Sequence, residues 1–172
     1  MVAMFAILLV CVVAFEFAIA AEVKALSSCG NRRQVVALTF DNRDIVVYDD
    51  TLMTVLREAE VKATFFEASR STATTSDKMC SAVSKLHDEG HQIEVTTDWY
   101  TDLSNMQQTF LDEQIKQSKE FVKKCTGGQE PKYFQPPYGK LLPSQAQHIS
   151  KKFGESYEIG FCLMTVIYEE FE

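Results

Sequence analysis

Two kinds of hydrophobic pattern alternate along the chain from residue 35 onward. Short runs of β-branched and aromatic residues predict buried strands, whereas apolar residues spaced three and four apart predict helices with one buried face. The predicted strands cover residues 35–40, 63–66, 92–96, 133–135 and 159–167. A helical pattern lies between each strand and the next, the first of them at residues 51–60.

Capping residues and glycines mark the ends of the later helices. A Ser or Asp at a helix start and a Gly just past its end are typical boundary signals, and a Ser followed by Gln three residues later forms a capping box. The predicted boundaries are, in chain order, Ser76 or Asp77 with Gly90, Ser104 and Gln107 with Gly127, and Ser144 and Gln147 with Gly154.

Strands that alternate with helices predict a parallel sheet built through right-handed crossovers. The pattern holds about five βα units, and a closed eight-unit barrel typically needs about 250 residues. At 172 residues the chain is long enough for one domain with a hydrophobic core. The sequence therefore predicts an α/β fold, an incomplete or distorted (β/α) barrel with parallel strands.

The first twenty residues differ in composition from the rest. Residues 2–15 are apolar and uncharged, and Ala18-Ile19-Ala20 suits a signal-peptidase site. We expect residues 1–20 to be a signal peptide, 21–34 an N-terminal segment and 35–172 the folded domain of a secreted protein. Because positive charge is missing near Met1, an uncleaved membrane anchor remains the alternative; after cleavage we expect no membrane contact.

Cysteine content and charge narrow the class of protein further. Removal of residues 1–20 would leave Cys29, Cys80, Cys125 and Cys162. Four cysteines in a secreted chain predict two disulfides, and three pairings are open. The spacings match no zinc motif. The net charge of −7 argues against nucleic acid as a partner, since nucleic acids favour clustered Lys and Arg.

Four segments resemble the polysaccharide deacetylases, the NodB-homology proteins of carbohydrate esterase family 4. Residues 35–41 (VVALTFD) resemble the first family motif, a strand that ends in Thr-Phe-Asp-Asp-Gly. Residues 51–66 (TLMTVLREAEVKATFF) are similar to the helix and strand that follow, residues 89–93 (EGHQI) to the approach to the second motif, and residues 133–139 (YFQPPYG) to the third. The segments fall in the family's order over residues 35–167.

The resemblance implies a metal-dependent removal of N-acetyl groups from glycans such as chitin. In that family a divalent metal such as zinc activates water and polarises the carbonyl, held by an Asp and two His residues. Carried over to this sequence, the three ligand positions are Asn42, Thr96 and Tyr100. Neutral amide, hydroxyl and phenol oxygens are poor ligands for such a metal. We therefore expect no metal cofactor.

The other catalytic positions implied by the resemblance are partly preserved. Asp41 matches the general base, and Gln135 stands where the family has the Arg that orients it. Tyr138 matches the residue whose backbone N–H contacts the oxyanion. The family's general-acid His belongs to a later segment, which we expect this chain to lack. Asp41 and Tyr138 are thus interpreted as vestiges of a catalytic site.

The main hypothesis is a catalytically silent secreted member of this family that keeps contact with chitin or another N-acetylglucosamine glycan. Trp99, Tyr100 and Tyr138 could line a groove in which sugar rings stack, although aromatic residues are more often part of a core. One alternative is an active zinc-type hydrolase with a site rebuilt from Asp41, Asn42 and other carboxylates. Another is a truncated product without a stable fold.

A helical zinc pair is the remaining candidate site. His87 and His91 are four residues apart, but Gly90 interrupts the helix between them. We therefore expect no metal site at these two histidines.

Overall fold

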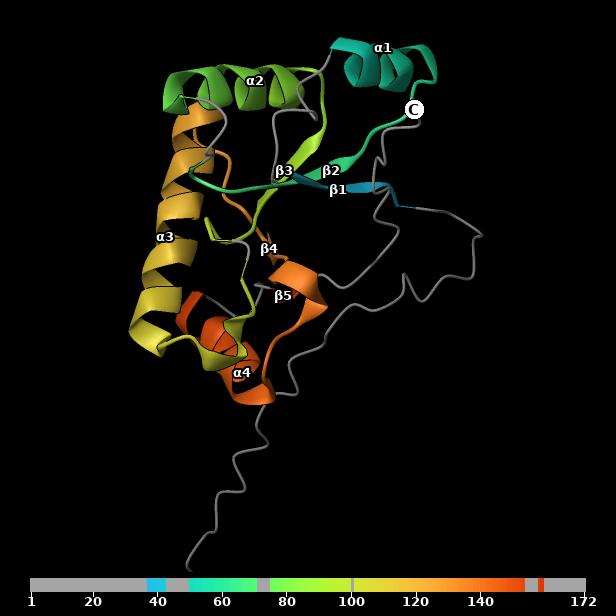
Figure 1. The fold of residues 1–172 in the computed structure, drawn as a ribbon. Helices are drawn as coiled ribbons and strands as arrows, with labels where there is room; N and C mark the ends of the chain where they lie inside the picture. Colours follow the sequence, from blue (N-terminus) through green and yellow to red (C-terminus); the bar gives the residue numbers. More distant parts are fainter. Residues whose placement is uncertain (1–36, 43–49, 71–74, 100, 154–157, 160–172) are drawn as a thin grey trace, which may run out of the picture.

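The computed structural model describes residues 37–42, 50–70, 75–99, 101–153 and 158–159. Five parallel strands form one sheet in the order β1-β2-β3-β4-β5 (Figure 1). They are β1 (Thr39–Asn42), β2 (Thr64–Glu67), β3 (Gln92–Val95), β4 (Tyr133–Phe134) and β5 (Glu158–Ile159). The helices between them are α1 (Asp50–Glu58), α2 (Ser76–Asp88), α3 (Gln108–Cys125) and α4 (Pro143–Phe153). The predicted α/β class with parallel strands is confirmed.

The strand order equals the chain order, so every crossover advances the sheet in the same direction. An open doubly wound sheet instead reverses direction at one point and places its site there. A sheet that never reverses is the arrangement of a (β/α) barrel, which carries its site at the carboxyl ends of the strands. The topology therefore directs attention to the residues that follow β1, β2, β3 and β4.

One face of the sheet packs against the helices and forms the hydrophobic core. Phe40, Phe65 and Ile93 lie in one row across β1, β2 and β3, and the rings of Phe40 and Phe65 stack with centroids 4.9 Å apart. Helices α2 and α3 pack against each other and against β3. Burying each large apolar side chain contributes about 1.5–3 kcal/mol. The buried helix residues of this core are Met53, Leu56, Met79, Val83, Leu86, Leu111, Ile115, Phe121, Val122, Cys125 and Ile149.

The next row of the sheet is partly polar. Side chains of successive strand residues point to opposite faces, so Asp41, Phe66 and Glu94, which pair across the same three strands, project from the face opposite the core row. Thr96 lies two residues after Glu94, so its side chain projects toward the same face of the sheet. Asp41, Glu94 and Thr96 thus lie on the face opposite Phe40, Phe65 and Ile93.

A disulfide joins the two helices that cover β3. Cys80 of α2 and Cys125 of α3 are bonded, 45 residues apart in sequence. This is one of the pairs allowed by the four cysteines, and closing a loop of this size stabilises the fold by about 2–4 kcal/mol. Cys29 and Cys162, which the same scheme would pair, lie outside the described residues.

Several predicted element boundaries are wrong by a few residues. Strand β1 begins at Thr39 rather than 35, and residues 35 and 36 lie outside the described part of the chain. Strand β5 is described only at residues 158 and 159, so most of the predicted strand 159–167 is likewise outside it. Gly90 and Gly127 do follow α2 and α3, each with positive φ (84° and 70°), as the stop signals predicted.

The predicted N-caps and capping boxes are also wrong. Thr75, and not Ser76 or Asp77, is the N-cap of α2. Ser104 lies in a short 3-10 helix (Leu103–Asn105), and its N–H is bound by the Asp102 carboxylate.

Helix α3 starts after Gln107, and its cap makes no side-chain hydrogen bond. Helix α4 starts at Pro143, because proline presets the φ angle of a first helical residue. Ser144 therefore falls inside the first turn, and Gln145 rather than Gln147 binds the preceding N–H of Leu142.

The described helices include none with the length and apolar composition needed to cross a bilayer.

Candidate functional site

The carboxyl ends of the strands bring the predicted site positions to one edge of the sheet. Asn42 of β1 pairs with Glu67 of β2, Glu67 with Val95 of β3, and Val95 with Phe134 of β4. Thr96 and Gln135 are the residues directly after Val95 and Phe134. The register therefore places Asn42 at the end of β1, Thr96 just after β3 and Gln135 just after β4. All three lie at the edge of the sheet where a barrel carries its site.

Thr96, which the resemblance assigns to a ligand position, is part of the framework of the sheet. Its side chain is buried, with 2% of the residue exposed. Its N–H donates to the carbonyl of Glu67 at 3.0 Å, and its hydroxyl donates to the carbonyl of Gln135 at 2.9 Å. The N–H of Gln135 donates in turn to the carbonyl of Val95 at 3.0 Å. Thr96 thus joins the ends of three strands through backbone groups.

The residues present do not fit a divalent metal of the zinc type. The Thr96 hydroxyl is neutral and already bonded to a carbonyl, and Asn42 offers an amide in place of a carboxylate. Such a metal takes imidazole, thiolate and carboxylate ligands. Among the described residues no group of three His, Cys, Asp or Glu side chains could hold a metal ion. Tyr100, the third predicted ligand position, lies outside the described residues.

Asp41, the predicted vestigial base, occupies the last part of β1. It pairs with Phe66 of β2, and both of its carboxylate oxygens are buried. At the place of the base's Arg partner, Gln135 brings a neutral amide, whose Oε1 is buried without a hydrogen-bond partner among the described residues. An amide supplies none of the positive charge that a guanidinium gives a neighbouring carboxylate. If Asp41 and Gln135 correspond to the base and its partner, as the resemblance predicts, the base position has lost its cationic neighbour.

Two buried carboxylates near these strand ends were missed in the sequence. Glu67 ends β2 and is fully buried. Glu94 of β3 is 1% exposed; one of its oxygens accepts the N–H groups of Lys132 and Tyr133, both at 2.7 Å. The other accepts from the side-chain amide of Gln92 at 2.7 Å.

Glu94 consequently fixes where β4 begins. Burial raises the pKa of Glu94 above its ordinary value, and the N–H bonds from Tyr133, Gln92 and Lys132 oppose that rise. The signal in the sequence was a carboxylate directly after the predicted strand 63–66, for Glu67, and one within the predicted strand 92–96, for Glu94. Buried carboxylates of this kind need hydrogen bonds to offset their desolvation.

Two of the three predicted aromatic contacts are surface residues. Trp99 is 54% exposed and Tyr138 is 58% exposed, so the alternative that they belong to the core is wrong. Each lies four residues beyond a member of the pair Val95 and Phe134, which joins β3 to β4. Tyr100 lies outside the described residues.

Tyr138 also has an unusual backbone. Its φ of 57° and ψ of 12° place it in the left-handed region, where a residue with a bulky side chain is strained by about 1–3 kcal/mol and which is frequent at functional sites. Tyr138 lies in a 3-10 turn (Pro137–Gly139) that follows β4.

Polar contacts join the loop after β3 to the loop after β4. Lys140 pairs with the carboxylate of Asp102 at 3.2 Å, and the side-chain amide of Gln145 donates to the carbonyl of Leu103 at 2.7 Å. Hydrogen bonds from Ser104, followed by the one from Lys140, lower the pKa of Asp102 to about 2. The loops that carry Trp99 and Tyr138 are therefore connected to each other, apart from their attachment to the sheet.

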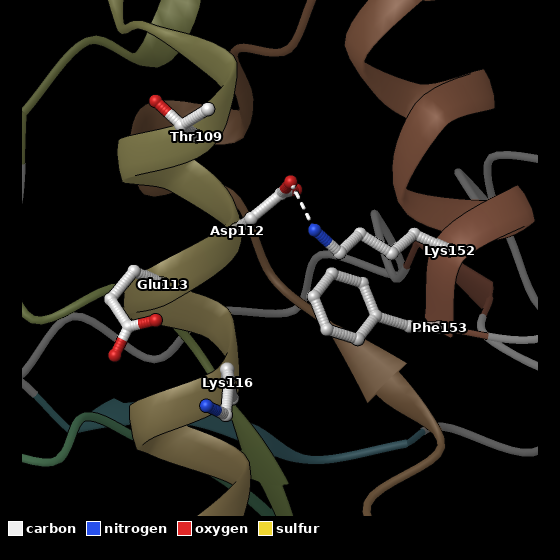
Figure 2. Close-up of a pocket in the computed structure, with 6 residues that line it drawn as sticks. All are labelled: Thr109, Asp112, Glu113, Lys116, Lys152 and Phe153. Carbon is white, nitrogen blue, oxygen red and sulfur yellow. Dashed lines mark hydrogen bonds and ion pairs between the residues drawn. The ribbon is translucent and has the colours of Figure 1, made fainter.

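A depression between α3 and α4 lies apart from the strand ends. Its volume is about 160 Å³, and Thr109, Asp112, Glu113, Lys116, Lys152 and Phe153 line it. Figure 2 shows Lys152 reaching across from α4 to Asp112 of α3, with 2.5 Å between the ammonium and the carboxylate. His148 binds the other oxygen of Asp112 at 2.7 Å. These contacts hold the two helices together and do not involve a residue of the predicted site.

The histidine pair considered as a zinc site is not a site of that kind. His91 is 5% exposed, and its Nδ1 accepts the N–H of Ala63 at 3.2 Å. Its ring meets the edge of Phe65 with centroids 5.3 Å apart. Burial, followed by the nearby Lys62, lowers the pKa of His91. His91 therefore has a structural role between β2 and β3, as a neutral ring.

The comparisons with known proteins agree with the fold and with the motifs. The family model described as polysaccharide deacetylase matches residues 30–157. A curated relative, the peptidoglycan-N-acetylglucosamine deacetylase of Bacillus cereus, is 30% identical over 110 residues, which is 64% of this chain and 38% of that protein. The chain thus spans well under half the length of the curated relative it matches.

Solved structures share the same fold. A family 4 pseudoenzyme from Bacillus anthracis superposes with a TM-score of 0.64 at 18% identity, over 75% of this chain and 43% of that one. A peptidoglycan N-acetylglucosamine deacetylase gives 0.61 at 27% identity, over 73% and 55%. The deacetylase structures have a distorted barrel fold, and the parallel sheet of this chain resembles a part of that barrel. By its matched motifs, its sheet topology and the extent of the match, the chain belongs to the polysaccharide deacetylase family.

Proposed function

We propose that this protein is a secreted, catalytically silent member of the polysaccharide deacetylase family that binds a glycan containing N-acetylglucosamine, chitin being our first candidate. The observation that carries the proposal is the role of Thr96. A residue at a ligand position is buried and uses its hydroxyl to bind the backbone of the next strand. A side chain engaged in this way supports the sheet and gives a metal no anionic or imidazole ligand.

The remaining positions support the same conclusion. Metal-dependent deacetylation needs a ligand set, a base with its partner, and an acid. Asn42 and Gln135 replace two charged residues of that set with neutral amides. Only Asp41 and Tyr138 match the family among the positions that we assign to catalysis, and neither activates water without the metal.

The glycan part of the proposal rests on surface chemistry. Trp99 and Tyr138 expose about half of their surface beyond neighbouring strand ends. Aromatic faces at such a position suit sugar rings, which present C–H groups to a negatively polarised face. The named relatives act on N-acetylglucosamine units of peptidoglycan. We propose that this chain binds the same sugar and does not carry out their reaction.

Secretion is supported by the disulfide between Cys80 and Cys125. Disulfides form and persist in oxidising compartments and are rare in the cytosol. Together with the apolar residues 2–15 and the Ala18-Ile19-Ala20 pattern, the bond favours export with removal of residues 1–20. N-terminal sequencing of the exported protein should start at or near Ala21; recovery of an intact Met1 in a membrane fraction would instead favour the anchor.

The decisive experiment measures metal, reaction and binding on the same preparation. We expect elemental analysis to find no stoichiometric zinc, and zinc-supplemented protein to release no acetate from chitin oligomers while an active family member does so in parallel. Calorimetry with the same oligomers at millimolar concentration should show modest binding. Tightly bound zinc with metal-dependent acetate release would falsify catalytic silence and establish the rebuilt-site alternative, and absence of any heat would remove the glycan.

A further inference from the structure

Trp99 has an exposed side chain and a firmly held backbone. Its N–H donates to the Oε1 of Gln114 on α3 at 3.3 Å. Its carbonyl accepts the hydroxyl of Thr97 at 3.0 Å and the N–H of Thr101 at 2.8 Å. The peptide groups on both sides of Trp99 are therefore fixed by the surrounding structure, although 54% of the residue is exposed.

The residue before Trp99 ties the same loop to two further elements. The Asp98 side chain is 2% exposed, and its carboxylate accepts the N–H of Ser69 at 2.6 Å and the hydroxyl of Ser69 at 2.8 Å. The hydroxyl of Ser118 on α3 lies 3.4 Å from the same carboxylate, and the Nε of Arg70 lies 3.8 Å from it. Asp98 thus anchors the loop to the segment after β2 and to α3.

The buried polar residues involved are costly for a core. Thr97 is 2% exposed, Gln114 3% and Ser118 0%, and burying such groups is unfavourable unless they are hydrogen-bonded. Gln114 and Ser118 are four residues apart on the buried face of α3, where apolar side chains would pack better. Gln114 accepts the N–H of Trp99, and the hydroxyl of Ser118 donates to Asp98. The result is an exposed Trp99 side chain on a backbone that is fixed by hydrogen bonds.

We propose that Thr97, Asp98 and Gln114 are positioning residues that hold Trp99 as a rigid stacking platform for one pyranose ring of an N-acetylglucosamine oligomer. This inference rests on the proposed glycan binding and adds to it the residue that contacts the sugar and the residues that orient it. A residue whose backbone is held in place before binding loses less conformational entropy when the ligand arrives, so affinity rises without an added contact. The three positioning side chains are buried and act only through Trp99.

Intrinsic fluorescence can test the platform directly, because Trp99 is the only tryptophan of the chain. Thr97→Val removes the hydroxyl that binds the Trp99 carbonyl and keeps the shape of the side chain. Thr97→Ser keeps the hydroxyl. The matched control is Thr126→Val, since Thr126 is also buried and its hydroxyl binds a backbone carbonyl, that of Val122, at 2.8 Å near the end of α3.

The measurements are tryptophan anisotropy without ligand and titration with chitin oligomers. Thr97→Val should lower the anisotropy and weaken the oligomer affinity about threefold to tenfold, the range expected for one lost hydrogen bond. Thr97→Ser should stay within about twofold of the wild type. Thr126→Val should lose thermal stability and leave the anisotropy and the affinity of the folded protein unchanged.

The outcomes separate the positioning role from the proposed function. Wild-type anisotropy and affinity in Thr97→Val would overturn the platform while leaving glycan binding in place. An equal loss in Thr126→Val would also overturn it, because the effect would then follow from stability alone. If the wild type binds no chitin oligomer in the titration, the proposed glycan binding is wrong, and the stacking role of Trp99 is wrong with it. That conclusion holds even if Thr97→Val lowers the anisotropy and Thr126→Val does not.

Discussion

The hydroxyl of Thr96 donates a 2.9 Å hydrogen bond to the backbone carbonyl of Gln135. The resemblance to the family predicts a metal ligand at the first position and the partner of the base at the second, and here the two residues bind each other through a backbone group. The bond joins the end of β3 to the residue after β4, a strand of only two residues in the described sheet. We infer that the Thr96 hydroxyl serves the framework of the sheet.

Removal of this bond should weaken the sheet. Thr96→Val keeps the branched shape and loses the hydroxyl, so the free energy of unfolding should fall by about 0.5–1.5 kcal/mol, and by somewhat more where the Gln135 carbonyl finds no water. Thr96→Ser should retain most of the stability. Urea denaturation followed by circular dichroism measures both. Equal stability of the valine variant and the wild type would show that the bond has no structural value.

Much of the fold could be predicted from hydrophobic periodicity, and the errors have physical causes. The row of Phe40, Phe65 and Ile93 belongs to strands that the pattern located within a few residues. The caps failed because a Ser followed by Gln occurs by chance near helix starts, and Pro143 or a preceding 3-10 turn determines where the helix begins.

The candidate site was harder to predict than the fold. Motif order predicted site positions at Asn42, Thr96 and Gln135, but no local pattern shows that a threonine hydroxyl will bond to the next strand. The roles of Glu94 and Asp98 depend on partners 38 and 29 residues away in sequence. Contacts of that kind join segments that are distant in sequence, and a local hydrophobic pattern does not show which of these segments meet.

Glu94 should make stability depend on pH on the acidic side. Its pKa in the folded protein is raised by burial above the 4.5 of an ordinary Glu. The folded state therefore binds a proton more readily than the unfolded state, and the wild type should gain stability as pH falls through the folded pKa toward 4.5.

Glu94→Gln can still accept from the backbone of β4 and cannot titrate, so its stability should lack this rise. Urea unfolding at intervals between pH 7 and pH 4 compares the two proteins. If the stabilities of the two proteins change with pH in parallel, the pKa of Glu94 is not raised in the folded protein. Glu94→Leu, which leaves the N–H groups of Lys132 and Tyr133 without their acceptor, should lose about 2–5 kcal/mol at every pH.

His91 should produce the opposite dependence. Burial, helped by Lys62 and opposed by Glu89, lowers its pKa below 6.5 in the folded protein. The unfolded state then takes up the proton first, so the stabilising effect is present above pH 6.5 and is lost as pH falls below it. His91→Asn offers an oxygen to the N–H of Ala63 and does not titrate. Its stability relative to the wild type should rise between pH 6.5 and pH 5, and a constant difference would argue against a buried neutral ring.

Restoring the three ligands tests the alignment of the site with the family. The change is Asn42→Asp, Thr96→His and Tyr100→His in one protein. Two imidazoles and a carboxylate form an open three-ligand zinc site, so we expect about one zinc per chain by elemental analysis. Without metal this variant should be less stable than the wild type, because an imidazole must fit at a residue that is 2% exposed and the bond to Gln135 is lost. Zinc should raise its melting temperature by binding the folded state.

Acetate release from chitin oligomers should nevertheless stay very low in that variant. Gln135 still stands at the place of the Arg that orients the base, and the three substitutions supply no general acid, a group worth about 10²–10⁴-fold in rate. Thr126→His serves as the control for a buried threonine replaced by histidine, and it should bind no zinc. If the triple variant also binds none, the assignment of Thr96 and Tyr100 to the ligand positions is wrong. If it deacetylates at the rate of an active relative, then metal loss alone silenced the protein and the substitution at Gln135 was of little consequence.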